Sequence, residues 1–171
     1  MSIEEKLKEL CKNSDLTRFE PPLRNSAADR YVYAGGEART FLMWDGSLDQ
    51  KFEGVSGQSL SLLDRFSNGS YVTVGMDPHD KDSSSHIARV DPIEHGIFAY
   101  RVRDPEPKVR IFGGFVMLDV LVLLTWHERE NCDFPFEAKK CRLAWDRILP
   151  QHPPIISDEI KHHVSKHFNI G

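Results

Sequence analysis

The sequence lacks the short motifs of several large enzyme classes. It contains no G-x-S-x-G nucleophile elbow, no phosphate-binding P-loop, no glycine-rich dinucleotide fingerprint and no H-E-x-x-H zinc motif. Each of these motifs supplies a backbone turn or a ligand spacing that its chemistry requires. Their absence removes the main sequence support for serine hydrolases of that type, P-loop enzymes, dinucleotide-dependent enzymes and zinc peptidases.

Cysteine is scarce, and there is no excess of positive charge. Only three cysteines occur, without a C-x-x-C spacing: Cys11, Cys132 and Cys141. An odd number of unpaired cysteines argues against a disulfide framework, so we expect a reduced cytoplasmic protein with inert thiols. The formal net charge of −4 excludes a bulk positive field that would draw the chain to nucleic acid. A nucleic-acid site would therefore need a local basic patch.

Long apolar runs are also missing. The longest run, from Phe115 to Trp126, contains Asp119 and is shorter than the roughly 18 residues that cross a bilayer. The N-terminal segment MSIEEKLKEL is charged and amphipathic, which is not typical of a secretory signal. We therefore expect no membrane partner.

Both ends of the chain carry helix signals. Ser2 and Glu5 form an S-x-x-E capping box, and apolar residues follow at helical spacing, so we expect an amphipathic helix at residues 3–12. Its apolar stripe would pack on the protein's own domain or, as the alternative, dock a partner. Near the other end, apolar spacing and proline breaks predict helices at residues 136–149 and 158–168.

The middle of the chain gives weaker signals. A polar connector is expected at residues 24–30, and a polar, solvated loop at 77–86. Residues 60–66 suit a short helix, which Gly54 and Gly57 keep from extending. Short strands are expected at Tyr31–Ala34, Ala38–Trp44, Tyr71–Met76 and Ile87–Val90.

The most hydrophobic stretch, residues 96–129, has the pattern of a three-stranded antiparallel β-meander. Apolar and polar side chains alternate in the first two strands, because successive side chains of a strand point to opposite faces. The third strand is apolar at nearly every position, as in a strand covered on both faces. A tight turn at Gly113-Gly114 is one option for the last connection, but a turn near residues 117–119 leaves strands of more similar length. The expected strands are Ile97–Arg103, Lys108–Phe112 and Val120–Trp126.

These elements together predict a single-domain α+β protein over residues 1–171. Its sheet is expected to be mostly antiparallel, with flanking helices at the N- and C-termini. The composition, with 40% hydrophobic and 28% charged residues, is that of a globular domain with a real core.

Two groups of polar residues have part of the spacing of a metal site. The first group stands at ligand positions of a calcium-binding loop: Asp80, Asp82, Ser84 and Asp91. Ser85, however, occupies the position where that loop requires glycine. His163 and His167 are four residues apart without an acidic residue between them. We expect a solvated loop and solvated or packed histidines, and hence no metal and no cofactor.

A basic set on the meander is the strongest candidate for chemistry. Its members are Arg101, Arg103, Lys108, Arg110, His127 and Arg129. Arginine and lysine bind phosphate oxygens through charge-assisted hydrogen bonds, and a neighbouring histidine can transfer protons. The alternative is a solvated sheet face whose cations pair with Asp104, Glu106 or Glu128.

The segments FAYRVRD, KVRIFGGF and VLVLLTWHER resemble three strands of the RelE/HigB-like toxin family. Members of this family are small α/β proteins that cleave messenger RNA on the ribosome and are held inactive by an antitoxin. The resemblance implies a toxin-like ribonuclease, or a catalytically degenerate relative, with Arg103 and Arg110 at the phosphate and His127 as acid or base. RNA and an antitoxin would then be its partners. The residues expected to bind the RNA backbone are Arg101, Lys108 and Arg129.

A non-catalytic protein-binding module is the alternative function. Its anchors would be Trp126, Trp145 and the apolar stripe of the N-terminal helix, although such residues more commonly belong to the core. A convergent basic cleft with an exposed His127 favours the ribonuclease. Ion-paired arginines and a buried His127 favour the binding module.

Overall fold

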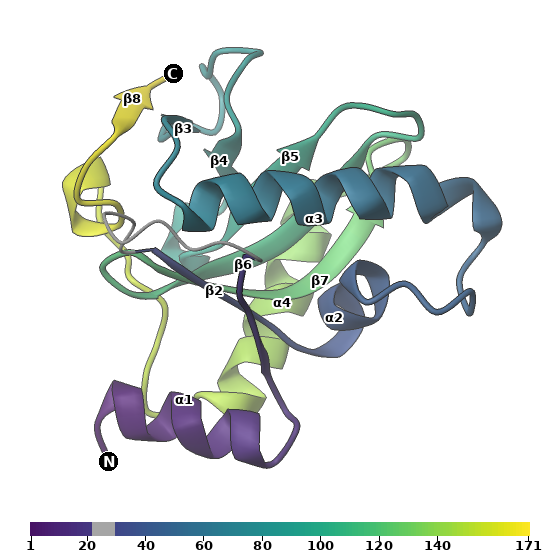
Figure 1. Ribbon diagram of the computed structural model, residues 1–171. Coiled ribbons are helices and arrows are strands. Elements are labelled where there is room, and N and C mark those ends of the chain that lie inside the picture. Colours follow the sequence, from purple (N-terminus) through teal and green to yellow (C-terminus); the bar gives the residue numbers. More distant parts are fainter. Residues whose placement is uncertain (22–29) are drawn as a thin grey trace.

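The computed structural model describes residues 1–21 and 30–171, and these residues form three layers (Figure 1). An eight-stranded sheet is the middle layer. Helices α2 (Gly36–Leu42) and α3 (Glu53–Ser67) cover one face of it, and α1 (Ile3–Lys12) and α4 (Phe134–Ile148) cover the other. The expected connector at residues 24–30 lies, except for its last residue, outside the described residues.

The sheet is mixed, so the prediction of a mostly antiparallel sheet is wrong. Its strand order is β1-β2-β7-β6-β5-β4-β3-β8, and the pairs β2–β7, β3–β4 and β3–β8 are parallel. Parallel partners come from distant segments, so the alternation within one strand gives no sign of them. The strands are β1 (Thr17–Phe19), β2 (Tyr31–Ala34), β3 (Val72–Gly75), β4 (Ile87–Arg89), β5 (Phe98–Val102), β6 (Val109–Met117), β7 (Val120–Glu128) and β8 (Phe168–Ile170).

The predicted meander is confirmed as the antiparallel run β5-β6-β7. The chain turns between Met117 and Val120, where Asp119 adopts a positive φ of 64°. The later of the two expected turns is therefore the one that forms, and Gly113-Gly114 lies inside β6. β6 and β7 are each nine residues long, and they carry the longest buried runs of the sheet.

The helices α1 and α4 confirm their predictions and pack on the same side of the sheet. Ser2 Oγ accepts from the Glu5 N–H and the Ser2 N–H donates to the Glu5 carboxylate, which completes the capping box. Leu7 and Leu10 of α1 are buried with Trp145 of α4 in one core, so the apolar stripe of α1 packs on its own domain. Across the described ranges, no helix combines the length and the apolar character needed to cross a bilayer.

Two predictions for residues 36–67 are wrong. The expected strand at Ala38–Trp44 does not form, and residues 36–42 form α2. Ala38, Phe41 and Leu42, at helical spacing, all enter the core beneath α3. The helix α3 begins at Glu53 and includes both Gly54 and Gly57. The cost of two helical glycines is about 1 kcal/mol each, which tertiary packing of the buried face offsets.

The prediction of a helix at residues 158–168 is also wrong. Only a 3₁₀ turn at Ile160–His162 forms, and the chain then extends into the edge strand β8. The turn between β6 and β7 holds this segment, since Asp119 accepts hydrogen bonds from the Ser165 N–H and hydroxyl. These tertiary contacts override a local helix preference. His163 and His167 therefore do not share a helix face.

Burial of His163 is expected to make the fold less stable in acid. Its fully buried ring lies between Phe98 and Phe115, and burial lowers its pKa although the carbonyl of Glu159 favours the charged form. The unfolded chain, with an ordinary histidine pKa of about 6.5, then binds a proton more readily than the folded one. The free energy of unfolding should fall as the pH drops below about 6.5 and level off below the lowered folded pKa.

Urea denaturation from pH 7.5 to 5 measures this dependence. We expect His163→Asn, whose amide can replace the ring Nδ1–H, to flatten the slope. Some slope should persist, because burial also lowers the pKa of His86. Equal slopes for wild type and variant would assign the acid sensitivity to other groups.

Candidate functional site

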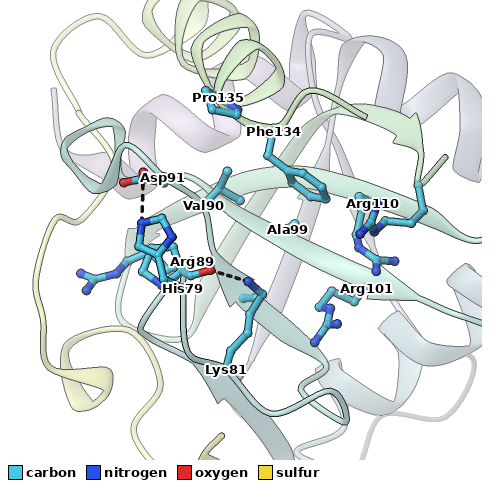
Figure 2. A pocket seen from close by; sticks show the side chains of 13 residues that line it. His79, Lys81, Arg89, Val90, Asp91, Ala99, Arg101, Arg110, Phe134 and Pro135 are labelled. Atoms are coloured by element: carbon cyan, nitrogen blue, oxygen red, sulfur yellow. Dashed lines mark hydrogen bonds and ion pairs between the residues drawn. The ribbon is translucent and has the colours of Figure 1, made fainter. Parts of the chain in front are cut away.

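A pocket of about 290 Å³ opens on the α4 side of the sheet, beyond the N-terminal end of that helix. We call it the basic pocket, because five cationic side chains line it: Lys81, Arg89, Arg101, Arg110 and Arg129. Arg89 differs from the other four, because its guanidinium is paired with the Asp158 carboxylate at 2.9 Å. In Figure 2, the Phe134 ring lies between Val90 and Arg110, and Arg101 and Lys81 lie below them. Arg89 comes from β4, and the other cations come from β5, β6, the end of β7 and the loop after β3.

The register of the meander explains why the arginines meet. Arg101 of β5 lies opposite Arg110 of β6. Their neighbours two residues away, Ala99 and Phe112, belong to the core beneath α4, and residues two apart on a strand share a face. Both arginines therefore point to the α4 side, at the edge that the helix leaves uncovered.

Small side chains leave room for the pocket. Ala88 of β4 and Ala99 of β5 are register partners, and both line the basic pocket. A pair of larger residues would fill the space beside α4. Phe134 at the first turn of α4 forms an apolar wall and packs edge-on against Phe112, with ring centroids 6.1 Å apart.

The cations in the basic pocket repel one another, and Lys81, Arg101 and Arg110 are at least partly removed from water, whereas Arg129 is exposed. Arg110 is only 5% exposed. Burial, and then the positive charges of Arg101, Arg129 and Arg103, lower its pKa to about 10. Burial and neighbouring arginines lower the pKa of Arg101 and of Lys81 as well.

Among the described residues, backbone carbonyls rather than carboxylates accept the side-chain hydrogen bonds of Lys81, Arg101 and Arg110. The Lys81 ammonium donates to the Pro78 carbonyl at 2.6 Å, and the Arg101 guanidinium donates to the carbonyls of Asp82 and Ser85 at 3.1 Å each. Arg110 donates to its neighbour's carbonyl, that of Val109. Within residues 1–21 and 30–171, none of the four cations other than Arg89 forms an ion pair. Their charge is therefore available to an anion.

The other members of the predicted basic set lie elsewhere. Arg103 turns to the loop after β3 and donates to the carbonyls of Ser83 and Ser84. The Lys108 side chain is exposed, and its Nζ lies 3.8 Å from Oε1 of Glu106. This pairing is the one expected in the alternative of a solvated sheet face. The expected set thus divides, and only its arginines at positions 101, 110 and 129 enter the basic pocket.

His127 lines a second, wider groove beside α2. It is the register partner of Arg110, but its Nδ1 lies 2.6 Å from the Glu128 carbonyl oxygen. Trp126 borders the same groove and packs against Phe41 and Phe52. His127 is half-buried and is not among the residues that line the basic pocket.

Sequence reasoning missed Lys81 and the pair formed by His79 and Asp91. His79 Nε2 lies 3.3 Å from the Asp91 carboxylate, and both line the basic pocket. These residues belong to or adjoin the polar segment 77–86, which the sequence presents as a solvated loop. A single lysine between Asp80 and Asp82 was the only available signal of a basic role.

The thiol nearest the basic pocket is not activated. Burial and the nearby Glu137 raise the pKa of Cys132 to about 11, although Arg129 and Arg110 act in the opposite direction. Burial raises the pKa of Cys141 to about 12. Thiolate is the nucleophilic form, so neither cysteine is poised for attack at neutral pH.

Compared with protein-family models, curated proteins and solved structures, the chain shows no match. The assignment of a function therefore rests on the geometry and charge of the basic pocket.

Proposed function

We propose that the protein binds a phosphate-bearing ligand in the basic pocket. The observation that carries this proposal is the burial of Arg110 beside Lys81, Arg101 and Arg129. Among the described residues, none of these four cations forms an ion pair with a carboxylate, whereas Arg89 of the same pocket is paired with Asp158. Burying an unpaired cation costs several kcal/mol, so such a group is expected where an anionic ligand completes the site.

Phosphate fits this arrangement better than a carboxylate does. A phosphate group carries up to two negative charges and presents several acceptor oxygens, and arginine binds it with two parallel hydrogen bonds. Arg101, Arg110 and Arg129 approach the space from three neighbouring strands or their ends, and Lys81 approaches from the loop. Several cations can thus contact one phosphate.

Titration calorimetry with inorganic pyrophosphate tests the proposal. The variants Arg101→Gln and Arg129→Gln should each weaken binding by about tenfold, as expected for the loss of one charge-assisted contact. The matched control is Lys108→Gln, a cation of the meander outside the basic pocket, which should bind as the wild type does. Absence of pyrophosphate binding, or equal losses in all three variants, would contradict a specific site.

The ribonuclease activity and the antitoxin partner stay predictions. The geometry supports ligand binding more directly than cleavage, because His127 lines a different groove from Arg110. Assays of RNA cleavage with wild type and His127→Ala test the catalytic role separately. We also infer a reducing, cytoplasmic setting, which the three free cysteines support.

A further inference from the structure

We infer that the ligand of the basic pocket is a phosphate ester that carries a planar ring, as a nucleoside monophosphate does. This inference rests on the proposed function and adds the chemistry of the ligand's second half. The pocket has a cationic part and an apolar part. A bare phosphate would occupy only the cationic part and leave the apolar part unused, so the ligand is expected to carry an apolar group as well.

Four apolar side chains line the apolar part, which we call the slot. Ala88 and Ala99 are small register partners on adjacent strands, and Val90 and Phe134 complete the lining. Phe134 is fixed in place on two sides, by its edge-on contact with Phe112 and by the Arg129 guanidinium 5.3 Å from its ring centroid. An aromatic ring placed on this wall gains stacking and buries apolar surface.

The charges set the direction in which such a ligand lies. In Figure 2, Arg101 and Arg110 lie on one side of Phe134, and the pair His79–Asp91 lies on the other. The carboxylate of Asp91 repels phosphate, and Arg89 on that side is already paired with Asp158, so the phosphate belongs at Arg101 and Arg110. Asp91 and His79 can then form hydrogen bonds with donors on the edge of the ring or with sugar hydroxyls.

The volume of the basic pocket limits the ligand to one such unit. At about 290 Å³, it lies at the lower end of the range for small-molecule sites, which begins near 300 Å³. One ring and one phosphate group fit this space, whereas a base pair does not.

Calorimetric titration of the wild-type protein with four compounds tests the inference. These are inorganic phosphate, ribose 5-phosphate, phenyl phosphate and adenosine 5′-monophosphate. We expect the two ring-bearing esters to bind at least about tenfold more tightly than ribose 5-phosphate, in line with one stacked ring. A further gain for adenosine monophosphate over phenyl phosphate would identify a nucleoside rather than a simple aryl group, and equal affinities would identify the aryl group as the recognised part.

The variant Ala88→Leu provides the matched test, because it fills the slot without changing any charge. It should remove the advantage of the ring-bearing esters over ribose 5-phosphate. In the wild type, nuclear Overhauser effects from adenine protons to the Phe134 ring and the Val90 methyl groups should be seen, which keeps the test independent of how the variant folds. Equal affinities of all four ligands would overturn the inference and preserve the proposed function. Failure of every phosphate compound to bind would overturn both.

Discussion

Replacing Arg110 with methionine is expected to abolish pyrophosphate binding and, at the same time, to stabilise the fold. The guanidinium is 5% exposed, and its hydrogen bond to the Val109 carbonyl does not neutralise it. Burial and three neighbouring arginines lower its pKa to about 10, which shows that the folded protein disfavours the charged form. Methionine keeps an unbranched, flexible chain and removes the charge. We expect the free energy of unfolding to rise by about 1–3 kcal/mol.

Paired measurements separate the two effects. Urea denaturation reports stability, and calorimetry with pyrophosphate reports binding. Pyrophosphate should raise the melting temperature of the wild type but not that of Arg110→Met, since a ligand stabilises only the state that binds it. Lys108→Met is the control, and this exposed cation should change stability by less than about 0.5 kcal/mol. A clear loss of stability in Arg110→Met would mean that the arginine supports the fold and is not held ready for a ligand.

At a functional site, a residue that is needed for binding is expected to lower the stability of the unliganded fold, as is expected for Arg110. Proteins retain locally unfavourable groups where a ligand repays the cost, and a charge without a partner in a core has no other evident benefit. The same reasoning explains why Lys81 and Arg101 rely on carbonyl oxygens. Carbonyls orient a cation without cancelling its charge, so the attraction for an anion persists.

The parts of the fold that could be predicted are those with local signals. The capping box at Ser2 and Glu5 marks the start of α1 within one turn, and the alternation in residues 97–112 marks β5 and the first half of β6. The apolar spacing of Cys141 and Trp145 similarly marks the buried face of α4. In each case the residues that give the signal are neighbours in the element that forms.

The wrong predictions concern segments whose partners are distant. The edge strand β8 forms because it pairs in parallel with β3, nearly a hundred residues earlier, and the Asp119 turn holds the chain before it. Residues 38–44 are predicted as a strand because they follow Gly35 and Gly36, which suggest a turn after the strand at Tyr31–Ala34. Gly35 is instead required by a close approach, since a Cβ there would lie 2.5 Å from the Asp15 carbonyl oxygen. No pattern within the segment reveals that neighbour.

The same distinction applies to the residues of the site: some could be placed from local signals, and others could not. Arg101 and Arg110 could be placed together because they lie on adjacent strands of a recognisable meander. Lys81 reaches them from a loop that Arg101 and Arg103 hold through carbonyl oxygens, and no periodicity marks such a contact. His127 is the register partner of Arg110, but it lines the groove beside α2 and not the basic pocket. Register thus predicts which residues are level with one another, but not which pocket each side chain enters.

Substituting Gly113 with alanine is expected to be the most damaging single change in the meander. Gly113 lies in β6 at a register shift, and a Cβ there would lie 2.0 Å from the Val122 carbonyl oxygen and 2.8 Å from the Leu123 Cα. Both contacts are with backbone of β7, which β2 and β6 hold from its two sides, so neither can move aside cheaply. The free energy of unfolding should fall by more than about 3 kcal/mol, with low soluble yield.

Gly57→Ala is the matched control, because it is the same chemical change at a helical glycine with open space around its missing Cβ. There the methyl group should raise the free energy of unfolding by about 0.5–1 kcal/mol, since alanine is the better helix former and restricts the unfolded chain. Urea denaturation of the two variants in parallel measures both effects. Opposite signs would tie the cost at Gly113 to the close approach of β6 and β7, on which the positions of Arg110 and Arg129 at the basic pocket depend. Similar small effects would mean that the central strands can separate locally, and the basic pocket could then not hold its arginines in a fixed geometry.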